Sequence, residues 1–378
     1  MNDDSCLPIL ALNSGSSSLK FGLYLVGIHT SRMLVSGGAE TVADGGVAFV
    51  AKDADGNVLA SDTRLLASPY AAINRIAELL AGQGLPSIAA VGHRMVHGGP
   101  LCRHHTVIDA TVMQHLETAK SFAPLHVPSA LSLLQFAQKQ FPDVAQVACL
   151  DTAFHTTMPE VARTLPIPGQ LRALGIERYG FHGLSCESIV RQFGKLVPRR
   201  LVIAHLGHGA SVTAVANGQS VDTSMGFTPS GGVIMSTRCG DIDPGVLVFA
   251  TREQGYDAEK LQELIDQRSG MLGISGVSGD MRTLRQLAAS TPEAKLAIAM
   301  FCYSVKKQIA AMAAALGGID ALVFTGGIGE NDAATRASIC VDLDALLGLS
   351  IATDSSAVHV MAAQEEEQIA LHTWHLTH

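Results

Sequence analysis

The chain has 378 residues, with 26 Lys and Arg against 34 Asp and Glu, for a formal net charge of −8. That length is about twice the size at which single cores tend to split, so we expect two domains. Hydrophobic residues make up 47% of the chain and charged residues only 16%, which excludes a disordered protein. A mild acidic excess without clusters of Lys and Arg argues against nucleic-acid and membrane partners.

Three further features of the sequence indicate the cellular compartment of the protein. The longest apolar stretch, residues 297–316, is interrupted by Lys306 and Lys307, so no membrane span is expected. The chain opens on Asp3 and Asp4 rather than basic residues, unlike a secretory signal. Seven scattered cysteines without a CxxC pair fit reduced thiols better than disulfides or a zinc site. We expect a soluble, cytoplasmic enzyme.

Short apolar runs and helical periodicity alternate along the chain. The predicted strands are residues 9–12, 19–26, 89–91, 144–150, a strand–turn–strand from 201, and 321–324. The predicted helices are residues 70–81, 129–140 and 364–378. Strands alternating with helices indicate an α/β protein.

Two segments half a chain apart resemble each other. In residues 9–17 and 203–211 an apolar strand ends in a tight Gly/Ser turn, and an apolar strand follows. The similarity suggests two related lobes, although a match of a few residues also arises by chance. Because no Pro/Ser-rich linker separates the halves, we place the boundary just after residue 149. The expected lobes are residues 1–149, with 366–378 packing back on them, and residues 150–365, which bind the nucleotide.

Several loops carry residues suited to anion chemistry. Residues 13–20 form a Gly/Ser turn with Lys20, which favours phosphate binding but is equally compatible with an ordinary hairpin, since the Walker pattern is absent. Arg94, between two histidines and before a Gly-Gly turn, is either an anion clamp or a surface ion-pair partner. Asp151 follows a strand and could bind Mg²⁺, act as a base or cap a turn.

The later motifs are a Gly-flanked His182, the turn from Arg238 to Pro244 with its two Asp residues, and residues 324–331 after a strand. The Gly spacing in 324–331 is wrong for a dinucleotide fingerprint and suits a backbone platform for a nucleotide. In order along the chain, these motifs closely resemble the acetate kinase family from about Ile9 to Ala370.

The resemblance implies a fold of two ribonuclease-H-like lobes, each a mixed β-sheet with flanking helices, around a nucleotide cleft. That fold is shared with sugar kinases, heat-shock ATPases and actin. The implied activity is reversible phosphoryl transfer between ATP and acetate, giving acetyl phosphate and ADP, with Mg²⁺ or Mn²⁺, in a homodimer. Acetate is already deprotonated at pH 7, so direct in-line attack needs no strong base, and Asp151 would position rather than abstract a proton.

The resemblance also assigns residues. The catalytic residues would be Asp151, His182 and Arg238, and the metal ligands Asn13 and Glu365, with Glu366 one register away. The acid-binding residues would be Arg94, Val96, Leu125, His126, Phe181 and Pro229. The nucleotide-binding residues would be Ser16, Ser18, Lys20, His205, Leu206, Gly207, His208, Gly209, Asp280, Met281, Arg282, Gly327, Ile328, Gly329, Glu330 and Asn331.

This sequence departs from the family pattern at several positions. His208 stands where the family has Asn, Cys186 where it has His, and Cys239 where it has Ser. The implied acyl pocket is small and apolar, which favours acetate and tolerates propionate. Two alternatives stay open: a propionate kinase of the same family, and a chaperone-like or actin-like ATPase.

Overall fold

The computed structural model describes residues 6–15, 18–41, 47–66, 71–82, 84–343 and 357–378. They form two compact units: the first extends to Ala153 and includes Gln364–His378, and the second is Phe154–Ala363. The sequence analysis placed Asp151 in the second lobe. The structure places it in the first, because β8 (Ala145–Leu150) belongs to the first sheet and the Asp151 N–H donates to the Met95 carbonyl.

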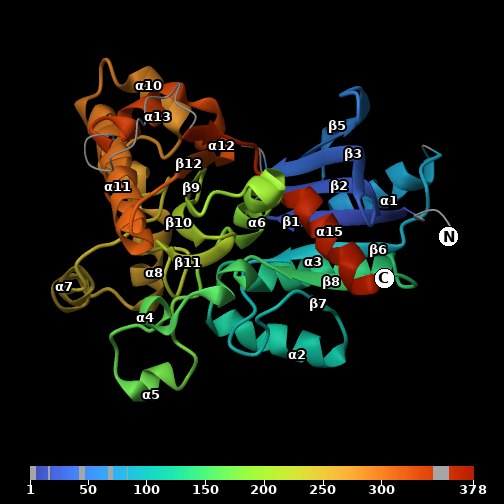
Figure 1. The fold of residues 1–378 in the computed structure, drawn as a ribbon, viewed down its shortest axis with the longest axis horizontal. Coiled ribbons are helices and arrows are strands. Elements are labelled where there is room, and N and C mark those ends of the chain that lie inside the picture. The colour runs from blue at the N-terminus through green and yellow to red at the C-terminus, as the bar shows by residue number, and fades with distance from the viewer. Residues whose placement is uncertain (1–5, 16–17, 42–46, 67–70, 83, 344–356) are drawn as a thin grey trace. The chain divides into compact units, whose positions relative to one another are not determined.

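The first unit is built on an eight-stranded mixed sheet with the order β5-β4-β3-β2-β1-β6-β8-β7 (Figure 1). Neighbours from β5 to β1 are antiparallel, β1, β6 and β8 are parallel, and β7 is antiparallel to β8. The other strands are β1 (Leu7–Ser14), β2 (Ser18–Gly27), β3 (Thr30–Thr41), β4 (Val47–Asp53), β5 (Val58–Leu66), β6 (Ala90–Met95) and β7 (Thr106–Val107).

Helices cover both faces of this sheet. Helices α1 (Ala71–Gly82) and α3 (Val127–Gln140) pack on the face that carries Leu10 and Leu12. The C-terminal helix α15 (Glu365–Thr377) packs against β1, β2, β6 and β8. A Cβ on Gly92 would collide with Ile369 and Thr373 of this helix, so its close approach requires glycine. Helix α2 is Ala110–Thr118, and a 3₁₀ turn follows at Ala119–Ser121.

The second unit has a five-stranded sheet with the order β11-β10-β9-β12-β13. Its strands are β9 (Arg200–Leu206), β10 (Ala210–Ala216), β11 (Gln219–Thr223), β12 (Ala321–Thr325) and β13 (Val358–Val360). Strands β9 to β11 are antiparallel neighbours, whereas β9, β12 and β13 are parallel. This repeats the order and directions of β3-β2-β1-β6-β8. The predicted α/β fold with a duplicated mixed sheet is confirmed, and the similar segments 9–17 and 203–211 begin on equivalent central strands.

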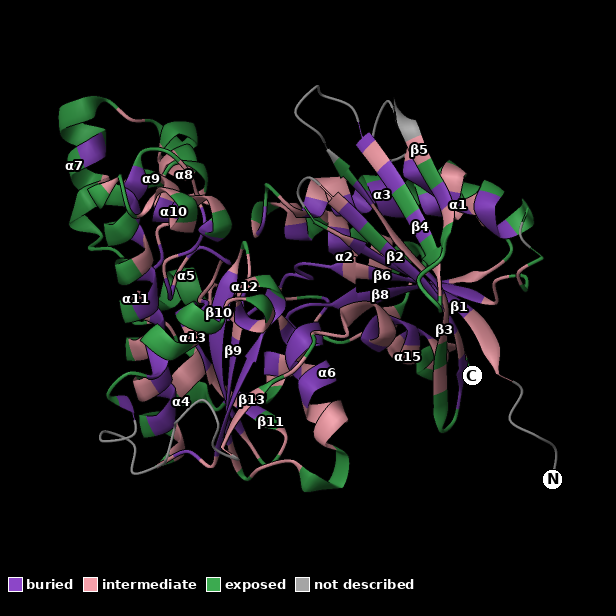
Figure 2. Cartoon of the chain, turned by 90° about the horizontal axis from the view of Figure 1, so that it is seen from above, coloured by how far each residue is buried: buried purple, intermediate pink, exposed green. Residues whose placement is uncertain are grey.

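The longest helix of the second unit, α11 (Pro292–Leu316), is long and apolar enough to cross a membrane by length and composition alone. Its buried side chains, among them Ala297, Phe301, Val305 and Ile309, recur every three to four residues along one stripe (Figure 2). That stripe packs against β9 and β10, as expected of a core helix.

The remaining helices of this unit are shorter. They are α4 (Glu160–Arg163), α5 (Gly169–Arg172), α6 (Gly183–Phe193), α7 (Gly245–Gln254), α8 (Ala258–Gln267), α9 (Gly270–Ser275), α10 (Met281–Leu287), α12 (Gly326–Asn331) and α13 (Ala333–Cys340). Two 3₁₀ turns lie at Ala153–Thr157 and Gly194–Leu196.

Candidate active site

Three polar side chains of the first unit lie at the carboxyl ends of neighbouring parallel strands. Asn13 is on β1, Arg94 is on β6, and Asp151 directly follows β8. Arg94 and Asp151 each come two residues after a residue that contacts α15, namely Gly92 and Cys149. Because side chains alternate between the faces of a strand, both point to the face that α15 covers. The carboxyl ends of parallel strands are where open α/β sheets bind ligands.

Arg94 and Asp151 form a buried ion pair. The Arg94 Nη2 donates to Asp151 Oδ2 at 2.8 Å, and its Nη1 donates to the Ser14 carbonyl at 3.0 Å. The Asp151 side chain is 1% exposed and that of Arg94 15%. Burial disfavours the charge on Arg94, but the neighbouring carboxylates, Asp151 first among them, raise the pKa of the guanidinium above its usual value. The Nε of Arg94 is buried and has no hydrogen-bond partner among the described residues.

Asn13 joins two carboxylates at the start of α15. Its Nδ2 donates to Glu365 Oε2 at 2.8 Å and to Glu366 Oε1 at 2.9 Å. Burial and the charge of Glu365 raise the pKa of Glu366, against a smaller lowering by the hydrogen bond from Asn13. Amide and carboxylate oxygens are the donors that Mg²⁺ prefers, usually with one or two carboxylates from the protein. The residues present therefore fit the implied metal, and both glutamates offer carboxylate oxygens for it.

The other residues expected in the first unit vary in burial. Ser16 lies outside the described residues. Ser18 begins β2, and Lys20 is exposed on the same strand. Val96 is buried, Leu125 is 38% exposed, and His126 is the N-cap residue of α3 without a capping hydrogen bond from its side chain.

In the second unit, donors from two loops converge on the turn between β9 and β10. A Cβ on Gly209 would lie 3.1 Å from Arg238 Nη1 and 3.3 Å from His182 Nε2. His182 has a left-handed backbone, with φ of 59°, which is uncommon for a residue other than glycine and typical of functional sites. Its Nδ1 contacts Ser211 Oγ at 2.9 Å, and its ring stacks on His205 with centroids 4.1 Å apart.

The same turn borders a cavity of about 810 Å³ that lies within the second unit. The expected nucleotide-binding residues that line it are Gly207, His208, Asp280, Met281, Arg282, Gly327, Ile328 and Asn331. The lining residues that were not predicted as ligands are Ser236, Thr237, Gly279, Arg285 and Asp332. Arg285 stands one helical turn after Met281 on α10, so helical periodicity offered a signal for it.

Two expected nucleotide ligands have other partners. Glu330 accepts hydrogen bonds from the N–H groups of Gly326 and Ala363, and its Oε1 lies 3.5 Å from Thr325 Oγ1. Gly329 is buried, and its carbonyl accepts from Arg336 Nη1. Residues 326–331 form the short helix α12, and Gly327, Ile328 and Asn331 of this helix line the cavity. Neither Gly329 nor Glu330 lines the cavity. Through its hydrogen bonds, Glu330 stabilises the turn that positions Gly327.

The three residues that depart from the family pattern lie in different chemical environments. Loss of water contact and the charge of Arg238 lower the pKa of His208, against a raising effect of Asp280, so the imidazole is neutral at pH 7. Burial raises the pKa of the Cys239 thiol to about 11, and the negative charges of Asp266 and Asp241 also raise it. This thiol therefore stays protonated. Cys186 is buried on α6.

Of the remaining second-unit residues, Phe181 is buried and its carbonyl lies 3.0 Å from His155 Nε2. Pro229 is also buried, and its carbonyl accepts from Arg238 Nη1 at 3.3 Å. Leu206 is buried at the end of β9. Phe181 directly precedes His182 in the sequence, and Pro229 contacts Arg238 through its carbonyl.

The chain is similar to known kinases over nearly its whole length. Acetate kinase of Brachyspira hyodysenteriae is 37% identical over 394 residues, covering 97% of this chain and 99% of that protein. Acetate kinase 2 of Neisseria meningitidis serogroup B is 42% identical over 356 residues, covering 92% and 88%. A solved propionate kinase from Francisella tularensis is 36% identical with a TM-score of 0.89, and Porphyromonas gingivalis acetate kinase is 34% identical with a TM-score of 0.85; each alignment covers 98% of this chain and 100% of the other. Residues 8–371 match the model of the Acetokinase family, and the chain belongs to that family.

Proposed function

We propose that this protein is an acetate kinase, which transfers a phosphoryl group reversibly between ATP and acetate to give acetyl phosphate and ADP. The observation that carries the proposal is the convergence of His182 and Arg238 on Gly209, beside a cavity of about 810 Å³. That volume lies within the range of small-molecule sites. Phosphoryl transfer spreads charge over the equatorial oxygens, so two nitrogen donors at one point lower its barrier.

Arg94 binds the carboxylate that accepts the phosphoryl group. Two of its nitrogens are occupied by Asp151 and the Ser14 carbonyl, whereas its buried Nε has no partner in the described part of the chain. A buried donor on a cation costs free energy unless a ligand accepts its hydrogen bond. A carboxylate is well suited to accept hydrogen bonds from a guanidinium. Asp151 holds Arg94 and orients the acid, which attacks the γ-phosphorus directly.

Asn13, Glu365 and Glu366 would hold Mg²⁺ or Mn²⁺. When bound, the metal would neutralise charge on the phosphate oxygens. The role of the chain is to orient these oxygen donors at the end of β1. Their joint contact with one amide supports a shared site.

Propionate is the second candidate substrate, because a solved propionate kinase is among the similar structures. The expected acyl-pocket residues, Val96, Leu125, Phe181 and Pro229, are all apolar. Such walls discriminate by only about 1–3 kcal/mol per methylene. We therefore expect acetate to be preferred and propionate to react more slowly.

A hydroxamate assay with ATP across acetate, propionate and butyrate tests the proposal. The expected result is acyl phosphate formation with the highest kcat/KM for acetate. A clear preference for propionate would transfer the assignment to propionate kinase. ATP hydrolysis that does not depend on any carboxylate would support the ATPase alternative instead.

A cytoplasmic homodimer is also part of the proposal, and it rests on the resemblance to the family. Light scattering after size-exclusion chromatography would measure the mass directly. Twice the 39.6 kDa of one chain is expected, and a mass of one chain would contradict it.

A further inference from the structure

The end of strand β8 needs a hydrogen-bond acceptor that the sheet does not supply. On one side, the Asp151 N–H donates to the Met95 carbonyl of β6. N–H groups alternate in direction along a strand, so the Leu150 N–H points to the other side, toward β7. Strand β7 has only two residues, and its first, Thr106, pairs with Ala148. The backbone ladder therefore ends before it reaches Leu150.

The side chain of His105 replaces the missing backbone acceptor. Its Nδ1 accepts the Leu150 N–H at 3.0 Å. Because a backbone N–H can only donate, Nδ1 carries no proton, and the hydrogen of the neutral ring is on Nε2. This hydrogen bond holds the residue that immediately precedes Asp151.

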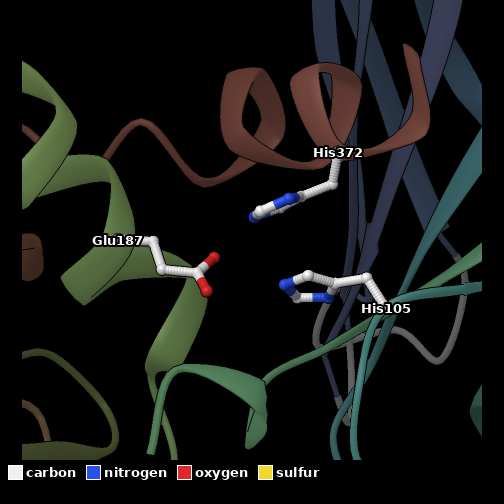
Figure 3. Close-up of side chains that lie close together, drawn as sticks. All are labelled: His105, Glu187 and His372. Atoms are coloured by element: carbon white, nitrogen blue, oxygen red, sulfur yellow. The ribbon is translucent and has the colours of Figure 1, made fainter. Parts of the chain in front are cut away.

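The same ring contacts the helix that carries Glu365 and Glu366. The rings of His105 and His372 lie with centroids 3.8 Å apart, tilted at an interplanar angle of 32°. Figure 3 shows the two rings next to each other, with His372 extending from α15. One turn earlier on α15, the Gln368 amide lies 3.0 Å from His372 Nε2. His105 thus contacts both β8 and α15 within the first unit.

We propose that His105 is a positioning residue for Asp151, acting through its hydrogen bond to the Leu150 N–H. The inference rests on the proposed function, since it assumes that Asp151 orients the acid. Removing the acceptor leaves a backbone donor unpaired at the strand end and frees Asp151 and its partner Arg94 to shift. Misplacement by about 1 Å can cost up to about 100-fold in rate.

Two substitutions separate the hydrogen bond from the ring contact. His105→Asn keeps an acceptor oxygen near the position of Nδ1 but loses the ring against His372, whereas His105→Phe keeps a ring and loses the acceptor. We expect kcat for acetate to fall about tenfold or more in the Phe variant and to stay within about threefold of wild type in the Asn variant. The KM for ATP should be unchanged in both, because the cavity lies in the second unit. His104→Phe, at the exposed neighbour, is the matched control.

Several results would overturn the inference. Wild-type kcat in the Phe variant would do so, as would equal losses in the Asn and Phe variants that follow their thermal stabilities. If the Phe variant does not fold, His105→Leu is the second acceptor-free variant, and amide exchange in the wild type gives a reading without substitution: the Leu150 N–H should be protected, and rapid exchange refutes the bond. Failure of the proposed function is distinct, because the wild type itself would then form no acyl phosphate.

Discussion

Lowering the pH from 7 to 4 should destabilise the first unit through His93, which precedes Arg94 on β6. His93 is 2% exposed, and its Nε2 lies 2.7 Å from Gln146 Oε1. The Gln146 Nε2 donates to the Phe141 carbonyl, so Oε1 accepts and the His93 Nε2 donates. Its Nδ1 is buried and has no partner among the described residues. A second proton on this ring would therefore be buried without an acceptor.

The size of the effect follows from the pKa of His93. Burial lowers that pKa from 6.5 to about 4, against a smaller raising effect of the hydrogen bond to Gln146. The unfolded chain takes up a proton below pH 6.5, whereas the folded chain resists it down to about pH 4. The contribution of neutral His93 to the free energy of unfolding is therefore fully present above pH 6.5. It is lost as the pH falls from 6.5 to about 4, by about 3 kcal/mol in total.

Urea unfolding at pH 7, 6, 5 and 4 measures this loss. The only tryptophan, Trp374, lies on α15 of the first unit, so its fluorescence follows that unit. His93→Gln keeps an amide donor toward Gln146 and does not titrate, while the exposed His29→Gln is the control. The wild type should lose up to about 3 kcal/mol more than His93→Gln, and carboxyl effects common to both cancel. Equal pH dependence of the two proteins would refute the reasoning.

Four further substitutions test the proposed site. Arg94→Ala should raise the KM for acetate at least tenfold with little change in the KM for ATP, and an unchanged acetate KM in steady-state kinetics would refute the clamp. Glu365→Gln and Glu366→Gln should each raise the Mg²⁺ concentration needed for half-maximal rate, because both carboxylates contact the same amide; an effect of only one would assign the metal to that residue alone. Gly209→Val should reduce kcat about tenfold or more by crowding the phosphoryl donors, with the circular dichroism spectrum unchanged.

The sequence predicted the parallel core of each unit better than its edges. Largely apolar runs at 9–12, 144–150 and 321–324, with Gln146 the one polar residue in them, correspond to β1, β8 and β12, because strands buried on both faces need no polar alternation. The antiparallel strands β3 to β5 were not predicted. These strands mix polar and apolar residues at the outer part of the sheet, and Gly37 and Gly38 interrupt β3, so neither period stands out.

The sequence alone could not predict the roles of residues that depend on partners far away in the chain. The strand-end position of Asp151 could be predicted from the apolar run before it, but its pairing with Arg94 depends on the register of β6 against β8. His105 showed no pattern, because its acceptor role arises from the shortness of β7. Glu330 was misleading for a similar reason: it follows a Gly-rich turn, yet its carboxylate is used by backbone N–H groups.

The duplicated hairpins carry groups of opposite charge preference, each within its own unit. In the first unit, Asn13 near the end of β1 contacts the carboxylates of Glu365 and Glu366, which are suited to a cation. In the second unit the equivalent turn has Gly209, whose lack of a side chain leaves room for the nitrogen donors of His182 and Arg238, suited to an anion. The same strand order thus presents opposite chemistry at equivalent turns. Phosphoryl transfer needs both kinds of group: a metal that neutralises the phosphate chain, and donors that stabilise the phosphoryl group being transferred.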